Sequence, residues 1–340
     1  MKIAIINPSD EFEIGIKGGN QLIAEALAKN IERYTPHKVT KIFLPLKTYP
    51  NLSLLKSYLA YSLTDLSKFD IIISLKFPSF MIKHKNHICY FAHFYRQFYD
   101  LWSDFKNKTP STYLTRFIIK SLDKKALSRT KKNYSYSKFI QSRLEEQGIK
   151  SELLYSPPIE ENFRSENYDY ILSTSILNDE RKRISLLIKS MKNIKENIKL
   201  IIVGDGPHKD YLKELAKDDK RIIFLGYKSP RQLLKLYANA LCTCIVSYKE
   251  DYGLVTIESM KSKKPVVTCV DSGGPLEFVE HKKTGLIAQP NPESISKQLS
   301  FLIKNKQKAK IMGENAFEKV KDINWRNVID KIINENSNEI

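Results

Sequence analysis

Short apolar runs typical of strands alternate with helix-like segments along this chain, and the alternation occurs twice. A repeated order of strand, helix and strand is typical of a parallel, doubly wound sheet in an α/β protein. Each half of the chain is therefore expected to form a Rossmann-like domain. The predicted strands span 2–7, 38–44, 70–75 and 87–93 in the first half, and 170–175, 198–203, 221–225, 241–247 and 265–270 in the second.

The two halves join near Ser156-Pro157-Pro158, where paired prolines and the polar residues up to Asn167 interrupt both patterns. A chain of 340 residues also exceeds the size of one typical core. We therefore expect one domain over 1–157 and a second over 158–321, with a cleft between them. A further helical segment is expected within 322–340.

Composition and cysteine usage indicate a globular protein of a reducing compartment. Hydrophobic residues make up 42% of the chain and aromatic residues 11%, which excludes a disordered class. No apolar run reaches the length of a membrane span, and the strand-like start is too short for a signal peptide. The four cysteines lack zinc-site spacing and lie in apolar runs, so buried free thiols are expected. We expect a cytoplasmic protein.

The net charge of +18 calls for an anionic partner, such as a phosphorylated small molecule, an anionic membrane surface or nucleic acid. No nucleic-acid-binding motif accompanies the charge, so nucleic acid is not expected. Basic residues concentrate in 116–138, where Asp123 is the only acid. This stretch predicts a basic amphipathic helix from Arg116 to Lys138 that can lie on a membrane. The alternative is the solvated face of an ordinary surface helix.

Glu250 and Glu258 bracket the segment in which chemistry is most clearly expected. The strand 241–247 precedes it, and Gly253 ends a loop that turns into a helix. In a parallel sheet this loop lies at the carboxyl end of a strand, where ligands bind. Free N–H groups at the helix start suit a phosphate. One glutamate precedes the helix and the other lies inside it, so they can address two parts of one ligand. The alternative is a surface loop with two solvated acids.

Glycines also occur in two other loops that follow predicted strands. Gly18 and Gly19 precede the first helix, and Gly204 and Gly206 follow the strand 198–203. Glycine there permits a ligand to approach the backbone closely, or simply a tight turn. Neither loop alone identifies a phosphate site.

Together these elements resemble glycosyltransferase family four, whose members are retaining enzymes with the GT-B fold. The resemblance covers nearly the whole chain and is strongest over 172–288. It implies an acceptor-binding first domain, a nucleotide-sugar-binding second domain, and a C-terminal helix over about 325–334 that crosses back to the first domain. The nine matching elements, in the order of the family, are Gly18-Gly19, 90–93, 135–139, 155–158, Lys182-Arg183, 203–207, the Glu250 and Glu258 pair, 271–277 and 281–287.

The resemblance also implies roles for individual residues. Glu258 would accept hydrogen bonds from the donor ribose, Glu250 would hold hydroxyls of the transferred sugar, and His93 would reach that sugar. Lys182 would neutralise the diphosphate. N–H groups of the helix start would assist it, so that no metal is needed. Retention could proceed by double displacement or by front-face attack, and the resemblance favours the second. The helix-start residues are Gly253, Leu254 and Val255.

One departure from the family concerns the phosphate clamp. Family members place an arginine several residues before the lysine, and here Ser175 or Ile176 stands in that place. Arg181 and Arg183 are the candidates to replace it.

These features predict a retaining transferase that moves a hexose of mannose or glucose type from a nucleotide-sugar to an acceptor hydroxyl. The stretch 89–96 is similar to enzymes that mannosylate lipid-linked oligosaccharides, which suggests a lipid-linked glycan acceptor and a peripheral position on the cytoplasmic membrane face. The donor is GDP- or UDP-linked. The alternatives are a sugar-nucleotide epimerase of similar fold and a basic nucleic-acid-binding protein.

Overall fold

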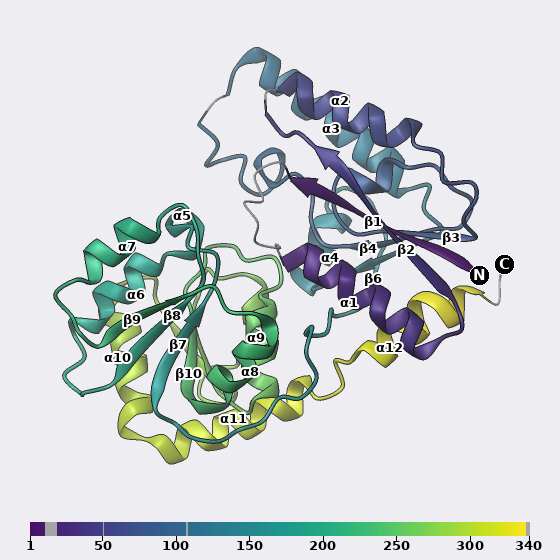
Figure 1. The fold of residues 1–340 in the computed structure, drawn as a ribbon. Coiled ribbons are helices and arrows are strands. Elements are labelled where there is room, and N and C mark those ends of the chain that lie inside the picture. Colours follow the sequence, from purple (N-terminus) through teal and green to yellow (C-terminus); the bar gives the residue numbers. More distant parts are fainter. Residues whose placement is uncertain (11–18, 50, 107, 338–340) are drawn as a thin grey trace. The chain divides into compact units, whose positions relative to one another are not determined.

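The computed structural model describes residues 1–10, 19–49, 51–106 and 108–337 (Figure 1). The chain forms two compact units. The first combines Met1–Ser156 with Asn324–Ile340, and the second is Pro157–Ile323. Gly18, which was predicted to lie in a ligand-binding loop, is outside the described residues.

The first unit contains a six-stranded, wholly parallel sheet in the order β2-β1-β3-β4-β5-β6. Its central strands are buried along their whole length, as expected for parallel strands covered on both faces. The strands are β1 (Lys2–Asp10), β2 (Lys38–Leu46), β3 (Ile71–Ser74), β4 (His87–Phe91), β5 (Lys132–Ser135) and β6 (Glu152–Leu153).

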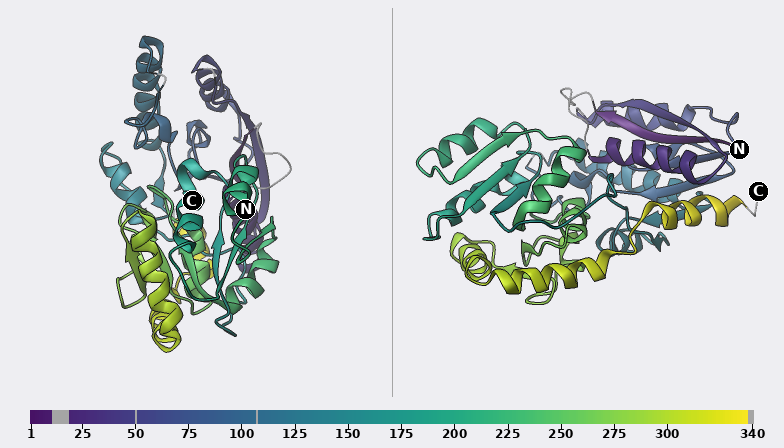
Figure 2. Two further views of the ribbon diagram at one scale, coloured as in Figure 1. Left: turned by 90° about the vertical axis from the view of Figure 1, so that its left-hand side faces the viewer. Right: turned by 60° about the horizontal axis from the view of Figure 1, so that its bottom comes forward.

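Helices cover both faces of this sheet (Figure 2). Those used below are α1 (Gly19–Tyr34), α2 (Asn51–Leu63), α3 (Pro110–Leu127), α4 (Lys138–Glu145) and α12 (Trp325–Ile329). A π-helical turn, Asp330–Asn334, and α13 (Glu335–Ser337) continue α12 to the end of the described chain.

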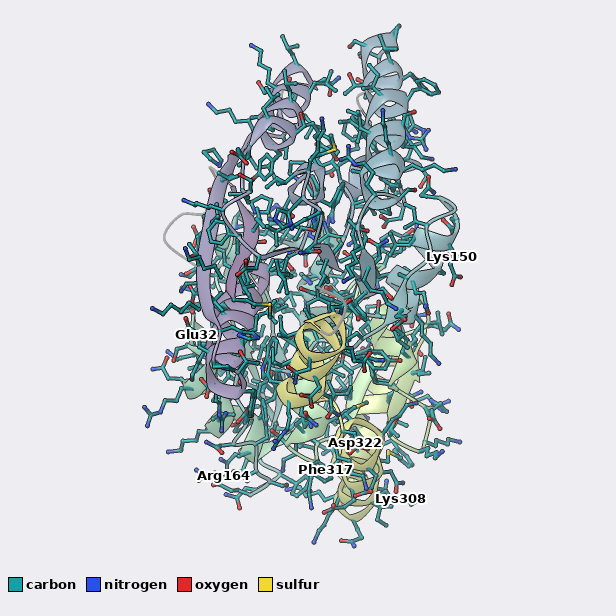
Figure 3. The ribbon with its side chains drawn as sticks, turned by 90° about the vertical axis from the view of Figure 1, so that its right-hand side faces the viewer. Glu32, Lys150, Arg164, Lys308, Phe317 and Asp322 are labelled. Atoms are coloured by element: carbon teal, nitrogen blue, oxygen red, sulfur yellow. The ribbon has the colours of Figure 1, made fainter. Side chains whose placement is uncertain are left out.

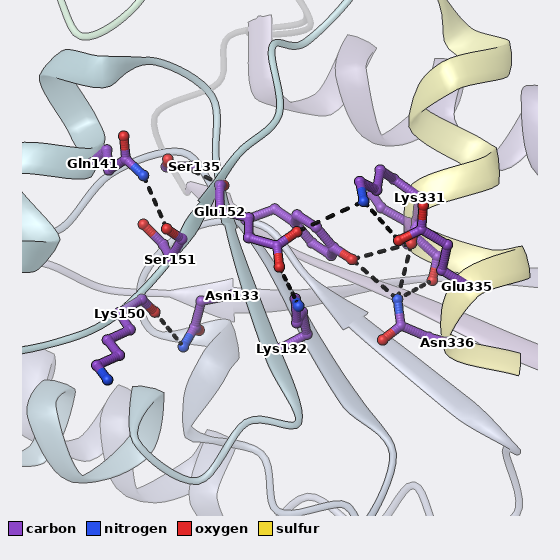
Figure 4. Close-up of polar contacts among 12 residues, drawn as sticks. Lys132, Asn133, Ser135, Gln141, Lys150, Ser151, Glu152, Lys331, Glu335 and Asn336 are labelled. Atoms are coloured by element: carbon purple, nitrogen blue, oxygen red, sulfur yellow. Dashed lines mark hydrogen bonds and ion pairs between the residues drawn. The ribbon is translucent and has the colours of Figure 1, made fainter. Parts of the chain in front are cut away.

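The C-terminal helical segment is attached to the first sheet at β5. The Tyr134 hydroxyl donates to the carbonyl of Lys331 at 3.1 Å, and the Asn336 amide donates to the Tyr134 hydroxyl at 3.2 Å. Glu152 on β6 forms ion pairs with Lys132 and Lys331 (Figure 4). The described residues from Asn324 onward therefore pack as part of the first unit.

The basic helix predicted over Arg116–Lys138 is wrong in its extent. Helix α3 ends at Leu127, whose carbonyl accepts hydrogen bonds from the Thr130 hydroxyl at 2.7 Å and the Asn133 amide at 3.0 Å. These side chains satisfy the helix end, and β5 begins a few residues later. The cations of the stretch are divided between a helix, a loop, a strand and the next helix, so they share no single face.

The second unit also contains a six-stranded parallel sheet, in the order β12-β11-β10-β7-β8-β9. Its strands are β7 (Tyr170–Thr174), β8 (Lys199–Val203), β9 (Ile222–Gly226), β10 (Ala240–Ile245), β11 (Val266–Cys269) and β12 (Gly285–Ala288). Its helices are α5 (Asp179–Lys182), α6 (Ile184–Met191), α7 (Lys209–Ala216), α8 (Pro230–Asn239), α9 (Leu254–Lys261), α10 (Pro292–Lys304) and α11 (Lys306–Val320).

Alternate residues of the second sheet enter different cores. Ile171 and Leu200 belong to a large cluster with side chains of α6, α7 and α10, whereas Leu172 and Ile201 belong to a smaller one beside α8. This period of two is the signature of a sheet covered on both faces. All four cysteines are free and buried, which confirms the thiol prediction.

The strand order of the second unit defines one position at which the chain reverses direction across the sheet. From β7 the chain moves outward to β8 and β9, then returns to β10 on the other side of β7. The loops after β7 and β10 therefore diverge at the carboxyl edge, which is where open parallel sheets bind ligands. None of the helices in the described part of the chain is both long and apolar enough to span a bilayer.

Candidate functional site at the carboxyl edge of the second sheet

The structure brings two predicted catalytic side chains together at this reversal point. Lys182 ends α5, just after β7, and Glu250 lies in the loop after β10. The Lys182 ammonium and a Glu250 carboxylate oxygen form an ion pair. Their side chains retain 24% and 22% of their exposure, so the pair is accessible to a ligand while partly shielded from water.

The backbone beside each partner adopts a conformation that is unusual for its residue type. Arg183 directly follows Lys182 with φ of 49°, and Lys249 directly precedes Glu250 with φ of 47°. A left-handed conformation in a residue other than glycine costs on the order of 1–3 kcal/mol and persists only where the surroundings impose it. Such residues gather at functional sites, in agreement with the position of the ion pair.

Arg183 fastens three loops of this edge together. Its guanidinium makes two hydrogen bonds of 2.8 Å to Asp271, after β11, and its Nε donates to the Val246 carbonyl at 2.6 Å. A further bond of 3.1 Å reaches the Ser247 carbonyl, after β10. The guanidinium is thus committed to protein acceptors. Of the two arginines predicted to replace the missing clamp, Arg183 therefore positions the loops, and a phosphate contact of Arg181 stays a prediction.

The loop that carries Glu250 is fixed by the neighbouring loop after β11. The Glu250 N–H donates to the Ser272 carbonyl and the Gly274 N–H donates to the Glu250 carbonyl, each at 2.8 Å. Gly253 has φ of 74°, and a Cβ there would lie 2.8 Å from Cγ of Pro275. Only glycine satisfies both conditions. The position of Glu250 is therefore set by backbone contacts on both sides.

Helix α9 begins directly after Gly253 with N–H groups pointing out of its first turn. Within the described residues, the N–H groups of Gly253, Leu254 and Val255 donate to no protein acceptor. Free N–H groups and the positive end of the helix dipole together favour an anion at this position. These three residues are the ones predicted from the sequence to hold a diphosphate.

Glu258 lies about a turn further along α9 and is 8% exposed. Its Oε2 accepts a hydrogen bond of 2.7 Å from the Tyr237 hydroxyl, which also lies 3.1 Å from the Thr174 hydroxyl. Burial raises the pKa of the Glu258 carboxyl to about 7 because the charged form loses its hydration. A group in this state accepts hydrogen bonds from ligand hydroxyls more strongly as it ionises.

The loops after β7 and β8 pack closely without an arginine between them. A Cβ on Gly204 would lie 1.8 Å from the Ser175 carbonyl oxygen, and the Gly204 N–H already donates to the Gly226 carbonyl at 3.0 Å. Gly204 therefore permits close packing of the loops, and its N–H is not available to a phosphate. Ser175 Oγ and Asn178 Oδ1 are buried without hydrogen-bond partners in the described structure.

His93 belongs to the first unit, two residues after β4. Its Nδ1 lies 2.8 Å from the Phe94 carbonyl oxygen and its Nε2 lies 3.1 Å from the Asn20 amide nitrogen. The carbonyl requires a donor, so Nδ1 carries the proton and Nε2 accepts. Gly19 begins α1 and adjoins Asn20. The predicted contacts of His93 and Gly19 with a donor sugar stay predictions.

Sequence reasoning missed the partners that hold the predicted residues in place. Tyr237 at the end of α8 and Thr174 at the end of β7 carry no motif, although a strand-end position was a weak signal for Thr174. Asp271 belonged to a recognised motif, but its pairing with Arg183 required the strand order. Among the described residues, no group of three or more His, Cys, Asp and Glu side chains could hold a metal ion.

The chain has two Rossmann-like units, each with a parallel sheet, and the second unit carries a charged site at its reversal point. These features define the class of protein. Residues 158–319 match the family model described as glycosyl transferases group 1. An uncharacterized glycosyltransferase of Methanocaldococcus jannaschii is 32% identical over 161 residues, which are 45% of this chain and 41% of that protein. An alpha-1,3/1,6-mannosyltransferase of Mus musculus is 31% identical over 109 residues, covering 31% and 26% of the two chains.

Solved structures show the same fold over the whole chain. The Anabaena protein HepE in complex with UDP and glucose aligns over 100% of both chains with a TM-score of 0.72 and 17% identity. WaaG, a glycosyltransferase involved in lipopolysaccharide biosynthesis, aligns over 97% of this chain and 99% of its own with a TM-score of 0.71 and 16% identity. The matches to the first three curated relatives span only 41%, 59% and 30% of the length of those relatives.

Residues 158–319 therefore resemble the glycosyl transferases group 1 family, and the whole chain has the GT-B fold. The predicted resemblance to a family-four glycosyltransferase and the predicted fold class are confirmed.

Proposed function

We propose that the protein is a retaining glycosyltransferase that moves a hexose from a nucleotide-sugar to an acceptor hydroxyl. The observation that supports this most is the Lys182–Glu250 ion pair at the reversal point of the second sheet. Beside it in the chain, α9 supplies unbonded N–H groups in its first turn and the buried carboxyl of Glu258.

Each end of the donor has a chemically matched group in this proposal. The diphosphate binds the N–H groups at the start of α9 and the Lys182 ammonium, which exchanges Glu250 for a phosphate oxygen. Glu250, released from the ion pair, accepts hydrogen bonds from hydroxyls of the transferred sugar. Glu258 accepts hydrogen bonds from the ribose, for which two carboxylate oxygens are well suited.

The barrier falls because charge develops where donors are already fixed. As the bond from the sugar C1 to the phosphate oxygen breaks, the leaving diphosphate gains negative charge, which Lys182 and the N–H groups stabilise without reorganising. The acceptor oxygen then bonds to C1 on the same face, and its proton passes to a donor phosphate oxygen. Glu250 serves here as a positioning group rather than a nucleophile. No metal is required in this scheme.

The phosphate clamp of this chain is proposed to differ from that of its family. Arg181 reaches the diphosphate from α5, while Arg183 is held by Asp271 and keeps the loops in place. The unpartnered oxygens of Ser175 and Asn178 occupy the loop where the family arginine would begin. Ser175 Oγ, as a hydroxyl, is able to donate one hydrogen bond to a phosphate.

The proposed donor is GDP-mannose, with UDP-glucose and UDP-N-acetylglucosamine as the alternatives. The mannose assignment draws on the similarity to mannosyltransferases, and the glucose alternative draws on the Anabaena structure with UDP and glucose. The proposed acceptor is a lipid-linked glycan at the cytoplasmic face of a membrane. WaaG, a structural neighbour, is involved in lipopolysaccharide biosynthesis.

Thermal protection and product analysis test this proposal in one series. GDP-mannose is expected to raise the unfolding temperature of the wild type more than UDP-sugars do, and Glu258→Ala is expected to lose that protection. Slow donor hydrolysis should release nucleoside diphosphate and a free hexose, with or without EDTA. Conversion of the donor into an epimer, with no release of nucleoside diphosphate, would support the epimerase alternative. Equal protection by every donor would contradict the mannose assignment.

A further inference from the structure

A cavity of about 400 Å³ lies at the amino edge of the first sheet, where the strands begin (Figure 1). This is the opposite edge from the one near His93, which follows the end of β4. Ligand pockets measure about 300–1,000 Å³, so the cavity suits a small molecule. The connection from β3 to β4, the first residue of β4 and the loop before β5 line it through Ile82, Lys83, His84, Lys85, His87 and Arg129.

The charged groups that line this cavity are all cations. Lys83, Lys85 and Arg129 each carry a positive charge, and none of the described lining residues is acidic. Asp70 belongs to the neighbouring turn, and its carboxylate accepts a hydrogen bond of 2.6 Å from the Lys2 N–H. Like charges gathered around one cavity repel one another, and a bound anion replaces that repulsion with attraction.

Most of the cationic donors at the cavity have no protein acceptor. Within the part of the chain that the structure describes, the Lys83 and Lys85 ammonium groups form no ion pair or hydrogen bond. Arg129 donates one hydrogen bond of 3.3 Å to the Met81 carbonyl, which holds its guanidinium beside the loop. The planar guanidinium has five N–H donors and matches two oxygens of a phosphate group. The cavity therefore offers donors suited to phosphate.

The loop that carries the two lysines is fixed by a histidine and an asparagine. His84 Nε2 lies 3.0 Å from the Phe69 carbonyl oxygen, and its Nδ1 accepts a hydrogen bond of 3.1 Å from the Asn86 N–H. The ring is therefore a neutral imidazole that donates at Nε2. The Asn86 amide donates to the Asp70 carbonyl at 2.9 Å. Because the loop is already ordered, a ligand does not have to bear the cost of ordering it.

His87 forms a buried wall of the cavity and stays uncharged. It is 3% exposed, and its Nε2 lies 2.8 Å from the Ser74 hydroxyl. Burial chiefly, and the positive charge of Arg129 as well, lowers the pKa of His87 to about 3. The positive field of Arg129 therefore extends to the buried wall of the cavity.

We propose that this cavity binds the phosphomonoester or diphosphate group of a soluble small molecule, at a site separate from the donor site of the second unit. Arg129 binds two oxygens of the phosphate group, and Lys83 and Lys85 neutralise its charge. A phosphodiester carries a single charge and should bind more weakly. The proposal does not depend on sugar transfer, because the cavity lies wholly within the first unit.

Calorimetric titration of pyrophosphate and of glucose 6-phosphate into the full chain tests the proposal. Lys182→Ala serves as the background, because pyrophosphate is also expected at the donor site. In this background, Lys83→Gln with Lys85→Gln should weaken binding about tenfold or more, since two cations no longer contact the anion. Arg129→Lys should weaken it less, because the charge remains and only the fork is lost. The ligand that binds more tightly identifies the source as a free diphosphate or a sugar phosphate.

The matched control is Lys308→Gln with Lys310→Gln on α11, which removes the same charge from exposed positions of the second unit (Lys308 is labelled in Figure 3). It should leave the affinity unchanged, and circular dichroism should show every variant folded. Hydrogen exchange followed by mass spectrometry locates the ligand, and pyrophosphate should slow exchange in 81–87. Equal weakening by the two double substitutions would overturn the proposal. So would slowed exchange confined to 250–258, or the absence of binding to Lys182→Ala.

Discussion

Each unit of the protein buries one carboxyl against a tyrosine hydroxyl, and the two settings differ in what surrounds them. In the second unit, Glu258 accepts a hydrogen bond of 2.7 Å from Tyr237. In the first, Asp123 accepts one of 2.6 Å from Tyr99. Burial raises the pKa of each carboxyl to about 7. By pKa alone the two groups are equivalent.

Their places in the fold separate them. Glu258 lies near the start of a helix that follows a strand at the reversal point, beside N–H groups without acceptors. Asp123 lies in the last turns of α3 and is completely buried. A raised pKa therefore reports burial, and the topology of the sheet decides which buried carboxyl can meet a ligand. We assign the ligand role to Glu258 and a structural role to Asp123.

The largest expected difference between the two units is in kcat/KM for sugar transfer when a residue of each is substituted. Lys182→Ala is expected to lower kcat/KM for sugar transfer about 10²- to 10³-fold, because it removes a fixed cation from the leaving diphosphate. Asp123→Asn, which keeps the shape of its buried side chain, should leave kcat/KM within about twofold of the wild type. Steady-state kinetics with the best donor measure both. Comparable losses in the two variants would break the distinction.

The two carboxyls should contribute alike to the pH dependence of the unfolding free energy. Only Glu258 should contribute to the pH dependence of ligand binding. Each folded-state pKa of about 7 exceeds the ordinary value, 4.5 for Glu258 and 3.8 for Asp123, so the folded state holds an extra proton between those limits. The associated stability is present at low pH and is lost as pH rises through about 7.

A variant in which either carboxyl is replaced by its amide should therefore lose less unfolding free energy than the wild type as the pH rises. Glu258→Gln and Asp123→Asn should each reduce the fall in unfolding free energy between pH 4.5 and 7.5 by up to about 3 kcal/mol. Denaturant unfolding across this range gives the differences. Nucleoside diphosphate affinity should increase as Glu258 ionises, and only Glu258→Gln should flatten that profile. A flattened profile in Asp123→Asn would contradict the assignment.

Two glycines with similar φ angles test how tightly the loop that carries Glu250 is packed. Gly253 and Gly226 have φ of 74° and 68°, but a Cβ on Gly253 would meet Pro275 whereas one on Gly226 would meet nothing within 4 Å. Gly226→Ala should cost about 1 kcal/mol of unfolding free energy from the backbone alone. Gly253→Ala should cost about 2–3 kcal/mol. Equal costs would show that the loop yields easily.

Effects smaller than that at Gly253 are expected from the two tyrosines. Tyr237→Phe and Tyr99→Phe each remove one hydrogen bond to a buried carboxyl, and each should lower the unfolding free energy by about 1–2 kcal/mol. Nucleotide affinity should change in Tyr237→Phe alone, since that hydroxyl orients Glu258. Chemical denaturation and nucleotide titration of both variants check this. A change of affinity in Tyr99→Phe would connect the first carboxyl to the site.

The sequence predicted much of the fold because strand and helix patterns alternate clearly, and each predicted strand occurs within about three residues of its observed bounds. It could not show that Lys182 meets Glu250, because their proximity depends on β7 lying beside β10 in the sheet. It also gave no sign that Arg183 would be held by Asp271. The stretch 116–138 was wrongly predicted to be one helix because its basic residues continue beyond the end of α3. Nothing in the order of the charges indicated that β5 begins at Lys132.

Calorimetric titration of GDP and UDP into the wild type, Glu258→Gln and Asp123→Asn is the most direct test of the donor site. One nucleotide should bind the wild type, and Glu258→Gln should weaken it about ten- to hundredfold by removing a charged acceptor from the ribose. Asp123→Asn should bind like the wild type. Unchanged affinity in Glu258→Gln, with the nucleotide still bound, would place the donor elsewhere and contradict the proposed site.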